Sequence, residues 1–111
     1  MSLIDNPTLK LLEHVLGYRD QRQDLITANI ANANTPGYKP FDLVLDQTLA
    51  TDSESPVHRS VRVGGAARLD GNAVSLDDEF VKMTENRMMY QAALELYDRW
   101  AGLNGIAREI R

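Results

Sequence analysis

The segment that most limits how this chain can fold is 28–39, where a helical pattern of apolar residues runs into several asparagines and then into Thr35, Pro36 and Gly37. Asparagine is a weak helix former because its amide competes for nearby backbone groups. Pro36 restricts the preceding residue to an extended conformation, and Gly37 adopts a positive φ at little cost. The sequence therefore predicts that a long helix ends here and that a turn redirects the chain.

The helix expected before this turn spans residues 7–33. Asn6 suits the N-cap, and Pro7 suits the first helical position, where its missing N–H costs little. One face repeats at three- and four-residue spacing and contains Leu9, Leu12, Leu16, Gln23, Ile26 and Ile30, with Arg19 as its charged member. A long helix with a single apolar face needs a second surface along most of its length.

A second helical pattern occupies the C-terminal part of the chain. Ser75 suits the N-cap, and Asp77, Asp78 and Glu79 place negative charge in the first turn, where the helix dipole is positive. Two neighbouring apolar seams follow. The first contains Leu76, Phe80, Met83, Tyr90, Leu94, Tyr97 and Ala101, and the second contains Met89, Ala92, Leu96, Trp100, Leu103, Ala107 and Ile110.

One partner helix cannot cover both seams. The uncovered seam either contacts another chain or is covered by the segment between the helices, and its contiguity favours the intermolecular contact. In that middle segment, residues 41–46 fit either a short strand or a helical turn, and residues 57–63 alternate as a strand does. Residues 51–56 have the composition of a loop, and residues 70–72 that of a turn.

The expected fold class is mainly α. Long N-terminal and C-terminal amphipathic helices form an antiparallel coiled-coil-like pair, joined by a short irregular or partly β middle segment. At 111 residues the chain is expected to form a single unit, with the N-terminal helix and its Asn-rich turn at 1–39, a variable connection at 40–70 and the C-terminal helix at 71–111.

Charge and composition argue against several classes of protein. The formal net charge is -4, and the basic residues are interspersed with acidic ones, so there is no stripe that could neutralise nucleic-acid phosphates. The absence of cysteine excludes disulfides and thiolate metal sites. The first residues lack the basic region and long apolar run of a cleavable signal peptide, so we expect any export to use another route.

The sequence offers little catalytic chemistry. His14 and His58 lie in different segments without partners at metal-ligand spacing, and no nucleophile elbow, phosphate loop or dinucleotide fingerprint occurs. Met83, Met88 and Met89 favour a core or interface over an adaptable peptide-binding surface. We therefore expect no catalytic residue, no cofactor, no metal site and no small-molecule substrate.

Two motifs, in the expected order, resemble the bacterial flagellar basal-body rod protein family. The first is an Asn-x-x-Asn-x-x-Thr-x-Gly-Tyr-Lys run, occupied by Asn29, Asn32, Thr35, Gly37, Tyr38 and Lys39. The second begins at Asp70-Gly71-Asn72, continues as Glu-x-x-Lys-Met-x-Glu-Asn and Tyr-Gln, and includes Met83, Asn86 and Tyr90. This second pattern is similar to that of proximal rod members of the family.

The resemblance implies a structural subunit of the proximal rod, assembling helically into the hollow drive shaft that transmits torque from the membrane ring to the distal rod and hook. It implies no catalytic activity. The implied partners are copies of the chain, other rod proteins, membrane-ring or rod-adaptor proteins and the flagellar export-gate proteins. The implied location is the rod in the periplasmic space, reached by type III export without a cleavable signal peptide.

The residues expected to carry assembly combine the turn motif with one side of the C-terminal helix. Beyond the turn they are Met83, Asn86, Tyr90, Leu94, Tyr97, Trp100 and Leu103. Tyr38 is expected to anchor the turn against an adjacent segment or subunit, the alternative being a helix stop without any partner contact. The alternative function is a soluble helical-hairpin adaptor or regulatory binding module, which would bind one discrete partner at finite stoichiometry.

Overall fold

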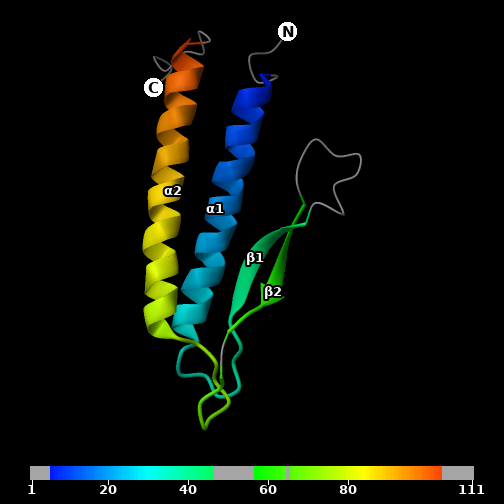
Figure 1. The fold of residues 1–111 in the computed structure, drawn as a ribbon, viewed down its shortest axis with the longest axis vertical. Helices are drawn as coiled ribbons and strands as arrows, with labels where there is room; N and C mark the ends of the chain where they lie inside the picture. The colour runs from blue at the N-terminus through cyan, green and yellow to red at the C-terminus, as the bar shows by residue number, and fades with distance from the viewer. Residues whose placement is uncertain (1–5, 47–56, 65, 104–111) are drawn as a thin grey trace.

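The computed structural model describes residues 6–46, 57–64 and 66–103. Their elements are helix α1 at Pro7–Ala31, strand β1 at Phe41–Asp46, strand β2 at Val57–Arg62 and helix α2 at Leu76–Leu103. Figure 1 shows α1 and α2 antiparallel and side by side, with the β1–β2 hairpin beside α1. The expected fold, mainly helical with a paired N-terminal and C-terminal helix and a strand-containing middle segment, is confirmed.

Both helices begin where the sequence predicts. The Asn6 Oδ1 accepts hydrogen bonds from the backbone N–H groups of Thr8 at 2.9 Å and Leu9 at 3.2 Å, and Pro7 is the first helical residue. At the start of α2, the Ser75 Oγ accepts a hydrogen bond from the backbone N–H of Asp78 at 3.3 Å. These bonds satisfy N–H groups that a helix leaves without an internal partner.

Helix α1 ends two residues before the predicted Ala33, because Asn32 caps it. The Asn32 Nδ2 donates to the carbonyl of Ala28 at 2.8 Å, and its backbone N–H bonds to the same carbonyl at 3.0 Å. The amide thus takes up a carbonyl of the last turn, which is the competition with the backbone that makes asparagine a helix terminator. Helix α1 leads directly into the Asn-rich turn.

The middle segment is a β-hairpin, so residues 41–46 are a strand and not a helical turn. β1 and β2 pair antiparallel, with Phe41 opposite Arg62 and Asp46 opposite Val57. The Arg62 guanidinium lies 4.2 Å from the centroid of the Phe41 ring, a cation–π contact that covers this end of the hairpin. The predicted loop at 51–56 and the predicted continuation of the C-terminal helix through Ala107 and Ile110 lie outside the described residues.

The apolar core is small and lies along the α1–α2 contact and under β1. Its buried apolar side chains are Leu9, Ile26, Ala33, Leu43, Val74, Ala93 and Ala101. Three of the buried positions on α2, Glu79, Asn86 and Ala93, repeat every seven residues and so share one face. Two of the three are polar, which means that the helices are joined by hydrogen bonds as well as by apolar contacts.

Helix α1 covers only part of the first predicted seam of α2. Met83, Tyr90 and Tyr97 are half-buried on the face toward α1, whereas Leu76, Phe80 and Leu94 are 43%, 50% and 40% exposed. The described residues of the second seam are exposed, with Leu96 at 53% and Leu103 at 75%. Neither described helix is long and apolar enough to cross a membrane.

Candidate assembly site

Asn29, in the last turn of α1, joins four parts of the chain through one fully buried amide. Its Nδ2 donates to the carbonyl of Phe41 at 2.7 Å and to the Glu79 Oε1 at 2.8 Å. Its Oδ1 accepts from the Tyr38 hydroxyl at 3.0 Å and from the backbone N–H of Phe41 at 3.0 Å. Every hydrogen-bonding position of the amide is filled, so α1, the Asn-rich turn, β1 and α2 are held in one arrangement.

Asn72 also joins separate parts of the chain, on the other side of the turn, and its side chain is fully buried. Its Nδ2 donates to the carbonyls of Asn32 at 2.8 Å and Thr35 at 2.7 Å, and its Oδ1 accepts from the backbone N–H of Val74 at 2.8 Å. The Arg68 guanidinium donates to the carbonyl of Ala33. Residues that precede α2 thus bond carbonyls just after the end of α1, and those of Asn32 and Thr35 also accept backbone N–H groups of the turn.

The two motifs singled out in the sequence meet at a pair of glycines. Gly37 and Gly71 have φ values of 75° and 81°, a region that L side chains rarely adopt. The backbone N–H of Gly37 bonds to the carbonyl of Asp70 at 2.8 Å, and that of Ala73 bonds to the carbonyl of Tyr38 at 2.9 Å. A Cβ on Gly71 would lie 3.1 Å from the Gly37 Cα, so the close approach of the two turns needs glycine at this position.

Asn86 joins the helices half-way along their contact and is 2% exposed. Its Nδ2 donates to the carbonyl of Arg19 at 2.8 Å and to the Gln23 Oε1 at 3.3 Å, and its Oδ1 accepts from the Arg19 Nη1 at 3.3 Å. A one-turn slip of α2 would break all three bonds. Asn86 therefore specifies the register of the pair, as a buried asparagine does in coiled coils.

A chain of charged side chains extends this network toward the hairpin. The Glu79 Oε2 accepts from the Lys82 Nζ at 3.3 Å, and the Lys82 Nζ lies 3.8 Å from the Asp42 Oδ2. Arg22 binds the Asp42 carboxylate through two nitrogens, Nε at 3.0 Å and Nη2 at 3.3 Å. Burial by itself raises the pKa of Asp42, but the hydrogen bonds from Arg22 and from the Leu43 backbone outweigh it and lower that pKa.

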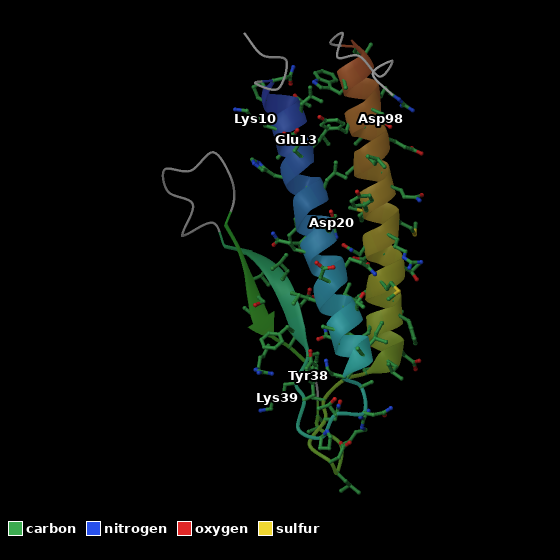
Figure 2. All side chains as sticks on the ribbon, turned by 180° about the vertical axis from the view of Figure 1, so that it is seen from behind. Lys10, Glu13, Asp20, Tyr38, Lys39 and Asp98 are labelled. Atoms are coloured by element: carbon green, nitrogen blue, oxygen red, sulfur yellow. The ribbon has the colours of Figure 1, made fainter. Side chains whose placement is uncertain are left out.

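Two hydrogen bonds join α1 and α2 at the end of the helix pair that is distant from the Asn-rich turn. The Tyr97 hydroxyl donates to the Glu13 Oε2 at 3.3 Å, and the Trp100 Nε1 donates to the Asn6 Oδ1 at 3.2 Å. Burial raises the pKa of Tyr97, and the charge of Glu13 raises it further. Figure 2 shows Glu13 and Asp98 near this end of the pair and Tyr38 and Lys39 at the opposite end.

The residues predicted for assembly divide into an inward and an outward group. Asn29 and Asn86 are buried, and Asn32, Tyr38, Met83, Tyr90 and Tyr97 are half-buried. The exposed group consists of Thr35, Gly37, Lys39, Leu94, Trp100 and Leu103. Figure 2 shows Lys39 pointing away from the helices. The inward group fixes the shape of one chain, and the outward group is accessible to a neighbour.

The sequence interpretation missed part of the inward group. It explained Glu79 by the helix dipole alone and did not include Arg22 in the packed face of α1, whereas Glu79 is 2% exposed and Arg22 is bound to Asp42. The seven-residue spacing of Glu79, Asn86 and Ala93 was the available signal, since it puts all three on one face of the helix. In the described part of the chain, no group of three or more histidines and carboxylates could hold a metal ion.

Two depressions lie along α2, and the second borders the Asn86 contact with α1. One, of about 530 Å³, is bounded mainly by apolar side chains, namely Phe80, Val81, Met88 and Met89, with Thr84 and Glu85. The other, of about 420 Å³, lies between α1 and α2 and is lined by polar side chains: Arg19, Asp20, Gln23, Asn86, Arg87, Tyr90 and Gln91.

Known proteins are similar to this chain over most of its length. The family model described as flagella basal body rod protein matches residues 18–39, which include Arg22, Asn29 and Tyr38. The flagellar basal body rod protein FlgB of Bacillus subtilis is 34% identical over 113 residues, covering 86% of this chain and 87% of the relative. FlgB of Cereibacter sphaeroides is 35% identical over 99 residues, covering 73% and 77%. FlgB of Escherichia coli is 29% identical over 112 residues, covering 78% and 81%.

Proposed function

Because this chain belongs to the FlgB family of flagellar basal-body rod proteins, it is a structural subunit of the rod, and we propose that it builds the proximal rod. In this proposal copies of the chain assemble helically into a hollow shaft that carries torque from the membrane ring to the distal rod and hook. The chain's work is mechanical and involves no catalysis or small-molecule substrate.

The observation that carries the proposal is the apolar surface of α2 that the other described residues leave uncovered. Met88 is 68% exposed, Leu96 53% and Leu103 75%, and they follow one another along the helix. An apolar surface of this kind on a single chain marks a contact with another protein. Neighbouring subunits of the rod would cover it.

The buried polar network suits this task because it presents the apolar surface in one geometry. Asn86 specifies the register of α1 against α2, and Asn29 fixes the turn and β1 against the same helix. A shaft built from many copies needs each copy to have the same shape. Stability from apolar contacts alone would leave the helices freer to slide.

We assign the chain the partners that a proximal rod subunit needs. Copies of itself and other rod proteins lie along the shaft, membrane-ring or rod-adaptor proteins lie at its base, and the export-gate proteins contact the chain during export. The proposed location is the periplasmic part of the basal body, reached without a cleavable signal peptide. The intact mass of the chain from isolated basal bodies tests this route, and removal of an N-terminal segment contradicts it.

Deletion of the gene tests the proposed function. We expect cells without the chain to keep the membrane ring but to form no rod or hook, as seen by electron microscopy of isolated basal bodies. Expression of the wild-type chain from a plasmid restores both. Normal rods and motility in the deletion strain would contradict the proposal.

A further inference from the structure

Helix α2 has two uncovered flanks that lie on opposite sides of its contact with α1. A helix turns by about 100° per residue, so Asp78 and Arg87, nine residues apart, project in opposite directions. The flank that contains Arg87 also has Phe80 and Leu94, which are 50% and 40% exposed. The flank that contains Asp78 also has Leu96, which is 53% exposed. Each flank is therefore apolar, with a charge of opposite sign.

Arg87 lies at the mouth of the polar groove between the helices, where Arg19 and Asp20 line the α1 side. Figure 2 shows Asp20 on α1, about half-way along the helix. The groove carries two guanidinium groups against one carboxylate. Among the contacts of the described residues, Arg87 has no ion pair and the buried Arg19 Nε has no acceptor.

A guanidinium without an ion-pair partner can bind a carboxylate, because its planar N–H donors match the two carboxylate oxygens. Asp78 is exposed, and its carboxylate has no partner among the described residues. Along one α2 axis it lies about 14 Å from Arg87, at 1.5 Å per residue, and on the opposite side. The Asp78 of one chain therefore cannot enter the groove of the same chain.

We propose that the groove between α1 and α2, with Arg87 and Arg19, receives the Asp78 carboxylate of a second copy of this chain. The proposal rests on the proposed function, since it describes how neighbouring subunits meet. The contact joins two different surfaces and repeats without closing, which is the geometry of a helical array. A two-fold contact through the Arg87 flank would instead place arginine against arginine.

The apolar side chains on the two flanks fit the same arrangement. When Asp78 of one copy lies beside Arg87 of the next and the two α2 helices run parallel, Met89, which is 48% exposed on the Asp78 flank, comes within about 6 Å of the level of Leu94. Apolar surface supplies the contact area, and the charge pair selects which flanks meet.

Charge reversal tests the pairing in cells whose rods are isolated and analysed for this chain. We expect Arg87→Glu and Asp78→Arg each to lower incorporation at least tenfold, and the two together in one chain to restore at least half of it. A matched control keeps near wild-type incorporation: Asp24→Arg, a charge reversal at an exposed carboxylate of α1 that does not line the groove. Undiminished incorporation of Arg87→Glu, or no recovery in the double variant, overturns the proposal.

Cross-linking provides a second test that does not depend on the charge change. The chain has no cysteine, so Asp78→Cys and Arg87→Cys supply its only thiols. Expressed beside the wild-type chain, the double variant should form covalent dimers and larger products when rods are treated with a short bis-maleimide, which spans the length of an arginine–aspartate pair, while Arg87→Cys alone forms none. Dimers from Arg87→Cys alone, or none from the double variant in rods that contain it, overturn the docking and leave the proposed function standing. Absence of the wild-type chain from rods contradicts the proposed function instead.

Discussion

The Asn29 amide donates a hydrogen bond of 2.8 Å to the Glu79 carboxylate, and both side chains are almost completely buried. This contact joins the last turn of α1 to the first turn of α2. The second Glu79 oxygen accepts from Lys82 at 3.3 Å, so the buried charge has partners on both sides. A buried carboxylate is tolerated only when it is paired in this way.

Removal of the Asn29 amide should therefore destabilise the chain strongly. Asn29→Ala leaves the Glu79 Oε1 and the backbone groups of Phe41 without their partner, and we expect the free energy of unfolding to fall by about 3 kcal/mol. Urea unfolding followed by circular dichroism measures it. Asn34→Ala, at an exposed asparagine of the same turn, should change it by less than about 0.5 kcal/mol. Equal losses of unfolding free energy in the two variants would contradict a stabilising role of the buried Asn29 amide.

Replacement of three glycines by alanine should change the free energy of unfolding in different directions. Gly71→Ala meets both a positive φ and a Cβ contact of 3.1 Å, so we expect a loss of about 2 kcal/mol. Gly37→Ala has a positive φ in open space and should lose about 1 kcal/mol. Gly17→Ala lies in open space within α1 and should gain about 0.5–1 kcal/mol through helix propensity. Melting temperatures of the three variants give the order, and a stabilised Gly71→Ala would refute the close contact.

Acid should weaken the attachment of the hairpin to α1. The folded-state pKa of Asp42 lies below its ordinary value of 3.8, so its contribution is complete above that pH and is lost as the pH falls through the lower, folded pKa. We expect wild type to exceed Asp42→Asn in unfolding free energy by about 1 kcal/mol from pH 7 to pH 5. This difference should shrink below about pH 4. A difference that stays constant down to pH 2 contradicts the pairing with Arg22.

A substitution at Leu103 should reduce assembly into rods without changing the stability of the free chain. Because this side chain is 75% exposed, Leu103→Ser should change the unfolding free energy of the free chain by less than about 0.5 kcal/mol and yet lower its amount in isolated rods severalfold. Leu9→Ala, at a buried position, should cost about 2–5 kcal/mol. Wild-type incorporation of Leu103→Ser would show that this end of α2 is not a contact.

Features that depend on local chemistry could be predicted from the sequence. The Asn6 cap, the Ser75 cap, the positive φ of Gly37 and the end of α1 near Asn32 all follow from residues within one turn of the site. The pairing of the two helices followed from their length and apolar patterns. For residues 41–46 the sequence allowed either a strand or a helical turn. The strand forms because this segment pairs with β2, which is distant in the sequence.

The buried polar network could not be predicted in the same way. Apolar periodicity drew attention to Phe80 and Leu94, whereas Glu79, Asn86 and Ala93 occupy the face toward α1. Asparagine and glutamate are buried only when partners distant in sequence satisfy them, and Asn29 and Glu79 are such partners. A single sequence does not show which distant groups will meet.

The most direct test of the account is the accessibility of the uncovered face of α2 before and after assembly. Met88→Cys places a thiol at a side chain that is 68% exposed in the chain alone. We expect a maleimide reagent to modify it at least tenfold more slowly in isolated rods than in the free chain, and at the rate of the free chain once the rods are dissociated. Equal rates in the free chain and in intact rods would contradict the claim that rod neighbours cover this surface.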